Sequence, residues 1–171
     1  MYRLVLLLWA LAAVAQSPKY GVGRTPTPDE IHQWSFSARP DGKGLPAGSG
    51  SVAPGKEIFT NRCSKCHGSA GQGGDAAPLV GGRGTLNTAK PLKTVESYWP
   101  YATTVFDYVK RAMPFNQPGT LTDDQVYAVT AYVLFLGRIV PENAVLDARS
   151  LPKIRMPNRD GFVPDPRPDV R

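Results

Sequence analysis

The sequence has few residues that can bind a metal or form a covalent cross-link. Its 171 residues include two cysteines, two histidines and three methionines. Two cysteines are too few for a disulfide-rich scaffold or for a four-thiolate zinc site, and two histidines cannot supply a three-imidazole catalytic metal centre. Any metal chemistry of this chain must therefore use a small set of ligands.

Residues that interrupt secondary structure are abundant, with 17 glycines and 17 prolines. They show no three-residue period, which excludes a collagen-like chain, and a hydrophobic content of 42% excludes full disorder. We expect an extended N-terminal arm over residues 16–51, one domain over 52–140 and an extended C-terminal arm over 141–171. Either arm could be solvated, or could clamp the protein's own core or a partner.

The first 15 residues are typical of an export signal. Arg3 precedes an apolar run that ends in Ala13-Val14-Ala15, the small-x-small pattern read by signal peptidases. The run of about 12 apolar residues is shorter than the roughly 20 that a spanning helix needs, so we favour a cleaved signal over a membrane anchor. The sequence therefore predicts a periplasmic protein, cleaved near Ala15 and Gln16, without a stable membrane span.

Helical patterns dominate the middle of the chain, so the expected fold class is all-α with little sheet. Pro114 ends one helix, and Thr122 with Gln125 fits a capping box at the start of the most apolar one. The glycine-rich stretch 68–84 predicts a loop that wraps closely around another group. The expected helices cover residues 29–34, 54–67, 103–113 and 122–136.

Both cysteines and one histidine lie within five residues, Cys63-Ser64-Lys65-Cys66-His67. This is the CxxCH pattern of c-type haem attachment. On one helical turn, the two thiols can reach the two vinyl groups of a haem, and the next residue places its imidazole beneath the iron. We therefore expect one covalently bound haem c, attached at Cys63 and Cys66 and ligated by His67.

Two other uses of a CxxC pair agree less well with the sequence. A thiol–disulfide redox pair accompanies a βαβ pattern, and we find none here. A zinc site needs further ligands, and His32 is the only other good one.

The second axial ligand of the iron can be sought by elimination. Once Met1 is removed, the ordinary candidates are Met113, Met156 and His32. We favour Met113, because it ends a predicted helix and is followed by Pro114, whereas Met156 and His32 lie in the arms. An open or lysine-ligated iron is an alternative, and Met113 could instead fill a gap in the core.

An iron bound by both His67 and Met113 has no open position, which favours electron transfer over catalysis. No residue is therefore assigned a catalytic role. The second ring nitrogen of His67 needs a partner, and a backbone carbonyl near Pro78 is well placed to accept its proton. Leu79 and Val80 are then expected to cover the haem face.

The order of these motifs resembles class I cytochromes c over residues 52–140. That resemblance implies a helical fold around one covalently bound haem, in which Gly55 and Phe59 of the first helix cross the last helix near Tyr132. The matching motifs after CxxCH are Ala77-Pro78-Leu79, Ala112-Met113-Pro114-Phe115 and Ala131-Tyr132-Val133.

A closer resemblance, to the SoxD-like cytochrome subunits of sulfane and sulfite dehydrogenases, extends into both arms. It implies that electrons arrive from a molybdenum cofactor in a separate SoxC-like catalytic subunit and leave to a small soluble cytochrome. Larger members have a second haem domain, whereas this sequence has a single CxxCH. The segments that support the resemblance are residues 42–50, 79–86, 97–104 and 155–162.

The main functional hypothesis is thus a periplasmic mono-haem electron-transfer subunit, not itself an enzyme, of a molybdenum-dependent sulfur-compound dehydrogenase. Alternatives are a free-standing shuttle cytochrome and a haem peroxidase or ligand sensor. Residues 55–115 contain eight basic and four acidic side chains. This excess of positive charge could form a solvated surface or a docking surface for an acidic partner. A nucleic-acid partner is not expected, because no dense basic stripe is present.

Overall fold

The computed structural model describes residues 22–167, except for the side chains of residues 32–34. The signal expected over residues 1–15 and the side chain of His32 lie outside this description. Residues up to Ser35 and residues from Phe36 onward form two separate compact units. The second unit, called the body below, contains all the other expected site residues.

The first unit contains helix α2 (Pro28–Trp34), which confirms the short helix expected there. Thr27 caps it reciprocally with Glu30: the Thr27 hydroxyl accepts from the Glu30 backbone, and the Glu30 carboxylate accepts from the Thr27 backbone at 2.8 Å. Pro28 occupies the first helical position, where its missing N–H costs nothing.

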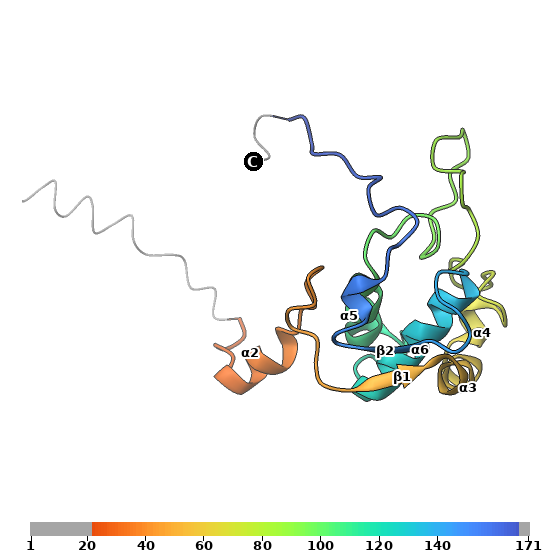
Figure 1. Ribbon diagram of the computed structural model, residues 1–171. Coiled ribbons are helices and arrows are strands. Elements are labelled where there is room, and N and C mark those ends of the chain that lie inside the picture. The colour runs from red at the N-terminus through yellow and green to blue at the C-terminus, as the bar shows by residue number, and fades with distance from the viewer. Residues whose placement is uncertain (1–21, 168–171) are drawn as a thin grey trace, which may run out of the picture. The chain divides into compact units, whose positions relative to one another are not determined.

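The body is built around helix α6 (Asp123–Leu136), which packs against α3 (Val52–Arg62) and α5 (Ala102–Ala112), as Figure 1 shows. Thr122 and Gln125 form the expected capping box at its start. Every residue from 126 to 134 is buried. This agrees with the sequence, because a helix that is apolar all round must have neighbours on every side.

The helix expected over residues 54–67 is two helices. It begins at Val52, because Pro54 falls in the first turn, where backbone N–H groups have no helical partner. It breaks at Cys63, whose φ of −124° is not helical, and continues as α4 (Ser64–His67). Helix α5, expected over residues 103–113, begins and ends one residue earlier than expected. It ends at Ala112, and Met113 is its C-cap.

Close packing of α3 on α6 occurs where the resemblance placed it. A Cβ atom on Gly55 would overlap the backbone carbonyl of Ala128, so only glycine permits this approach. One turn further, the rings of Phe59 and Tyr132 lie 5.3 Å apart between centroids. The helical class I cytochrome c fold expected from the sequence is thus the fold observed.

The part of the N-terminal arm that belongs to the body, residues 36–51, packs against its helices. The buried carboxylate of Asp107 accepts a hydrogen bond from the Ala38 backbone at 2.8 Å. The hydroxyl of Tyr127 donates to the carbonyl of Pro46 at 2.9 Å. These side chains on α5 and α6 supply partners for a backbone segment without regular structure of its own.

The two arms also meet each other. Strand β1 (Ser49–Ser51) pairs antiparallel with β2 (Val145–Asp147), with Gly50 opposite Leu146. A short 3₁₀ helix (Leu151–Lys153) follows, and Leu151 and Met156 are buried in the core. Residues 36–51 of the N-terminal arm and the C-terminal arm as far as Met156 are therefore packed into the protein's own body. No helix within residues 22–167 is long and apolar enough to cross a membrane.

Candidate functional site

The CxxCH residues lie where α3 passes into α4. Cys63 is the half-buried residue at the break, and its carbonyl accepts from the backbones of Cys66 at 3.2 Å and His67 at 3.0 Å. Gly68 ends α4 with a φ of 78°. Neither cysteine is in a disulfide, and Cys66 is exposed. One tight turn thus brings together two free thiols and an imidazole.

The surroundings of Cys63 disagree with one alternative use of a CxxC pair, the thiol–disulfide redox pair. Burial raises the pKa of the Cys63 thiol to about 11, so it is neutral at pH 7, unlike the low-pKa thiolate of a disulfide oxidoreductase. Within the described residues no three His, Cys, Asp or Glu side chains gather as a metal site.

The imidazole of His67 is oriented by the backbone. Its Nδ1 lies 2.9 Å from the carbonyl oxygen of Ala77. Because a carbonyl can only accept, Nδ1 is the protonated nitrogen, and Nε2 has the free lone pair that a metal requires. This confirms the expectation that a carbonyl beside Pro78 holds the ring.

The glycine-rich loop folds back onto α4. The Gly73 backbone donates to the His67 carbonyl at 2.8 Å, and the Ala76 backbone donates to the Cys66 carbonyl at 2.9 Å. Gly73 adopts a φ of 96°, which a side chain would strain. These bonds bring Ala77, and with it Pro78 and Leu79, back beside the CxxCH turn.

Met113 lies at the end of α5, half-buried and followed by the buried Pro114. The loop after it is tied to the CxxCH segment through Arg62, whose Nη2 donates to Gln117 at 3.2 Å and to Thr120 at 3.1 Å. The residue just before Cys63 thus holds the loop that follows Met113. Met156, the alternative ligand, is 1% exposed and belongs to the hydrophobic core.

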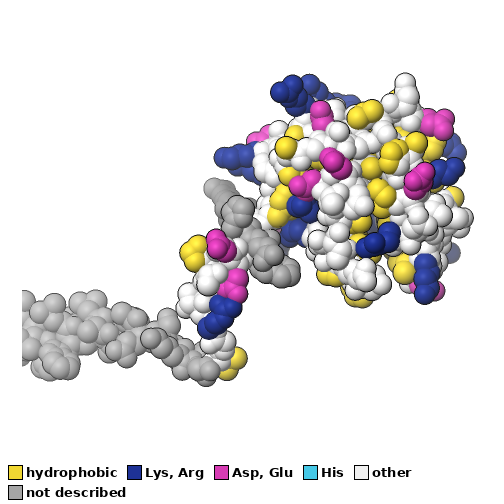
Figure 2. All heavy atoms as spheres, turned by 90° about the horizontal axis from the view of Figure 1, so that it is seen from below, with side chains coloured by type: hydrophobic (Ala, Val, Ile, Leu, Met, Phe, Trp, Pro, Cys, Tyr) yellow, Lys and Arg dark blue, Asp and Glu magenta, His cyan; other side chains and the backbone are white. Residues whose placement is uncertain are grey.

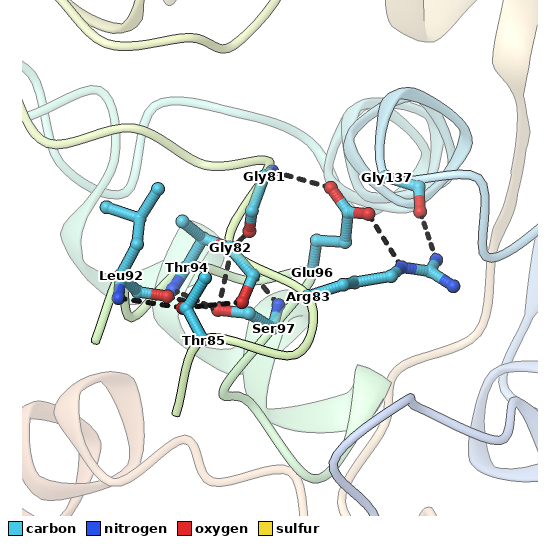
Figure 3. Close-up of polar contacts among 9 residues, drawn as sticks. All are labelled: Gly81, Gly82, Arg83, Thr85, Leu92, Thr94, Glu96, Ser97 and Gly137. Atoms are coloured by element: carbon cyan, nitrogen blue, oxygen red, sulfur yellow. Dashed lines mark hydrogen bonds and ion pairs between the residues drawn. The ribbon is translucent and has the colours of Figure 1, made fainter. Parts of the chain in front are cut away.

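A polar network fixes the segment that follows Leu79 (Figure 3). The carboxylate of Glu96 accepts from the Gly81 backbone and from Arg83 Nε, both at 2.6 Å. Arg83 Nη2 also donates to the carbonyl of Gly137, just after α6, at 2.5 Å. This network could not be predicted from the sequence, because nothing in the pattern indicates that Arg83 and Glu96 pair across 13 residues.

A second set of bonds closes the same loop. Thr94 Oγ1 donates to the Gly81 carbonyl at 2.8 Å, and Ser97 Oγ donates to the Leu92 carbonyl at 2.6 Å. Both side chains are buried. The segment from Leu79 to Ser97 is therefore held in place, although it contains no helix or strand.

The donor set fits a haem c. Covalent attachment needs two unpaired thiols at this spacing, and the iron needs an imidazole with a free Nε2; the CxxCH turn supplies both. A thioether at Met113 is the second donor that the sequence predicts, at the end of a helix whose following loop is tied to this turn through Arg62.

Comparison with known proteins agrees with this geometry. The cytochrome c family model matches residues 52–136. A chain in the crystal structure of the sulfane dehydrogenase SoxCD from Paracoccus pantotrophus superposes on this one with a TM-score of 0.78 and 44% sequence identity. The superposition covers 87% of this chain and 74% of that one.

Two curated relatives are thiosulfate dehydrogenases. That of Stutzerimonas stutzeri (strain A1501) is 27% identical over an alignment of 115 residues, which covers 58% of this chain and 35% of that protein. That of Psychrobacter arcticus is 28% identical over an alignment of 118 residues, which covers 63% of this chain and 34% of that protein. The chain thus spans about a third of the length of these relatives.

Proposed function

Because this chain belongs to the cytochrome c family, we propose that it is the periplasmic electron-transfer subunit of a molybdenum-dependent dehydrogenase that oxidises sulfane sulfur or sulfite. The cofactor of the family is a covalently bound haem c, which supplies a reversible one-electron redox centre. The CxxCH pair Cys63 and Cys66 is its attachment site.

The chain's own residues divide the work of holding this group. His67 is the first axial ligand, fixed in orientation by the Ala77 carbonyl. Met113 would supply the second ligand, and Pro78 and Leu79 would line the binding site. An iron held by both side chains would have no position open to a substrate. Substrate oxidation therefore belongs to a separate, SoxC-like molybdenum subunit.

The observation that best supports membership of a dehydrogenase complex is the share of this chain that superposes on the SoxCD chain. The cytochrome c model matches residues 52–136, about half of the chain, whereas the superposition covers 87% of it. Parts of the two arms are therefore shared with that chain. An arm is not needed to hold a haem, so its retention at this identity favours a common role in assembly.

The relatives also narrow the substrate class. The SoxCD neighbour is a sulfane dehydrogenase, and both curated relatives are thiosulfate dehydrogenases. All three act on reduced sulfur compounds, so we place this chain in that chemistry. A small soluble cytochrome is the proposed acceptor of its electrons.

The proposal is tested by co-expressing the full chain with the SoxC-like subunit of the same organism and purifying the pair anaerobically. Thiosulfate, sulfite or a sulfane donor is then added while the haem absorbance is followed. We expect at least one to reduce the haem, and no reduction when tungsten replaces molybdenum. If all three fail although the catalytic subunit oxidises substrate with an artificial acceptor, the chain serves another enzyme.

Export is tested separately, because it does not depend on the partner. Full-length protein is expressed with its own N-terminus, and the haem protein is isolated from the periplasmic fraction. The mass of the mature chain should correspond to a start at Gln16. A haem protein that retains Met1 would contradict the proposed cleavage.

A further inference from the structure

The C-terminal arm passes from buried to solvent-exposed near Phe162. Upstream, Met156 is 1% exposed within the core, whereas every described residue from 161 to 167 is exposed. Figure 1 draws this last stretch as an extended trace without helix or strand. The arm is thus anchored at one end and open to contact with another molecule at the other.

Three contacts fix the point from which this stretch departs. Asn158 Nδ2 donates to the Tyr98 carbonyl at 2.7 Å, and the Arg159 guanidinium lies 4.1 Å from the centre of the Tyr101 ring. The Phe162 ring stands edge-on to Tyr98, with 5.2 Å between centroids. Because its root is already ordered, the stretch loses less conformational freedom when it binds.

The side chains of this stretch suit an apolar binding site. Phe162 is 51% exposed and Val163 is 84% exposed, so two large apolar neighbours face water. Pro164 and Pro166 follow; each restricts its own φ and has no N–H to donate. Extended, proline-restricted segments of this kind bind in grooves lined by aromatic side chains.

The charged side chains of residues 162–167 give this stretch little net charge. The Asp165 carboxylate accepts from Arg167 Nε at 3.0 Å and from Nη2 at 2.6 Å, so these opposite charges neutralise each other. On the face of the body that Figure 2 shows, basic and acidic side chains are interspersed as well. Recognition at residues 162–167 therefore depends on apolar contact.

We propose that residues 162–167 are the docking segment that binds the catalytic partner subunit, with Val163 and the exposed face of Phe162 against an apolar, aromatic-lined groove of that subunit. This rests on the proposed function, which supplies the partner. A segment that left the body only to be solvated would not need its root pinned by Asn158 and Arg159. The superposition on the SoxCD chain, which reaches beyond the cytochrome c domain, favours the catalytic subunit over a second copy of this chain.

The test compares two substitutions of the same kind. Val163→Glu places a charge on the docking segment, and Val145→Glu, at a 59% exposed position on β2, is the matched control. Binding of the full, haem-loaded chain to the isolated SoxC-like subunit is measured by isothermal titration calorimetry. Val163→Glu should raise Kd by about tenfold or more, as loss of a hot-spot residue does, and the control by less than about twofold.

Thermal unfolding and the haem spectrum of both variants should match those of the wild type, since both positions are exposed. Equal affinities for wild type and Val163→Glu would overturn the docking segment while leaving the proposed function intact. No binding by the wild type would overturn both. Sedimentation velocity adds one more outcome: a wild-type dimer that Val163→Glu dissociates, with partner binding unchanged, would assign the segment to a second copy and refute the proposal.

Discussion

His67 and Ala77 are joined by a hydrogen bond of 2.9 Å between the ring Nδ1 and the backbone carbonyl oxygen. The carbonyl is held there by a loop whose Gly73 bonds back to the His67 backbone. The orientation of the imidazole therefore depends on the fold of residues 68–76, the loop between His67 and Ala77. A change in that loop should be felt at the haem without any change of ligand.

Gly73→Ala tests this coupling. The new Cβ would lie 3.2 Å from the Pro78 backbone nitrogen, at a φ of 96°, so the loop must shift near Ala77. We expect a loss of about 1–3 kcal/mol in unfolding free energy and a changed haem reduction potential. Gly84→Ala is the control, because its φ of 75° is similarly strained but no atom lies within 4 Å of the new Cβ. An unchanged potential in Gly73→Ala would contradict the coupling.

Gly55→Ala should disturb the crossing of α3 and α6. Its Cβ would overlap the backbone of Ala128, which cannot move aside as a flexible side chain could. We expect a loss of about 3 kcal/mol or more in chemical denaturation, within the range for overpacked cores. Asn61→Ala, at an exposed position of the same helix, should change stability by less than about 0.5 kcal/mol. A stable Gly55→Ala protein would mean that the helices can separate without cost.

Glu96→Gln should loosen the loop after Leu79. The Glu96 side chain is only 12% exposed and accepts from both Arg83 and the Gly81 backbone. Loss of its charge should cost about 1–3 kcal/mol, the usual range for hydrogen bonds to a charged group. The exposed pair Arg155–Asp160 provides the comparison: Asp160→Asn should cost less than about 1 kcal/mol. Equal effects of the two substitutions on denaturation midpoints would contradict this view of the network.

Tyr127 predicts a pH dependence at the alkaline end. Burial, helped by nearby Asp123 and Asp147, raises the pKa of its hydroxyl from 10.0 to about 12. The unfolded chain therefore loses this proton at lower pH than the folded one. The contribution of the protonated Tyr127 hydroxyl to the free energy of unfolding consequently falls as pH rises from 10 to 12. Unfolding free energy should decrease more over this range in the wild type than in Tyr127→Phe. An equal decrease in the wild type and in Tyr127→Phe would show that folding does not raise the pKa of the Tyr127 hydroxyl.

Much of the fold could be predicted because its signals are local. The capping box at Thr122 lies within four residues of sequence, and CxxCH lies within five. The break at Cys63 was missed because apolar spacing reports which face a residue is on and not its φ. Pairing of β1 with β2 joins segments more than 90 residues apart, and the Ser-Gly-Ser of β1 has no strand-like pattern.

Some features of the site could also be predicted from the sequence, and others could not. The Ala77 carbonyl was anticipated because a ligand histidine needs a partner for its second nitrogen. The Arg83–Glu96 network was not, because two exposed-looking charges reveal nothing about a common partner until the loop is folded. Burial of Met156 was also missed, because a proline-rich tail offers no periodicity to show which side chains face inward.

The central claim is one iron site between His67 and Met113, and proton NMR of the reduced haem protein tests it most directly. A methionine bound to haem iron gives a three-proton signal shifted far upfield by the ring current of the macrocycle. We expect this signal in the wild type and in Met156→Leu, and its loss in Met113→Leu. A signal that survives Met113→Leu, or that disappears only in Met156→Leu, would contradict the account.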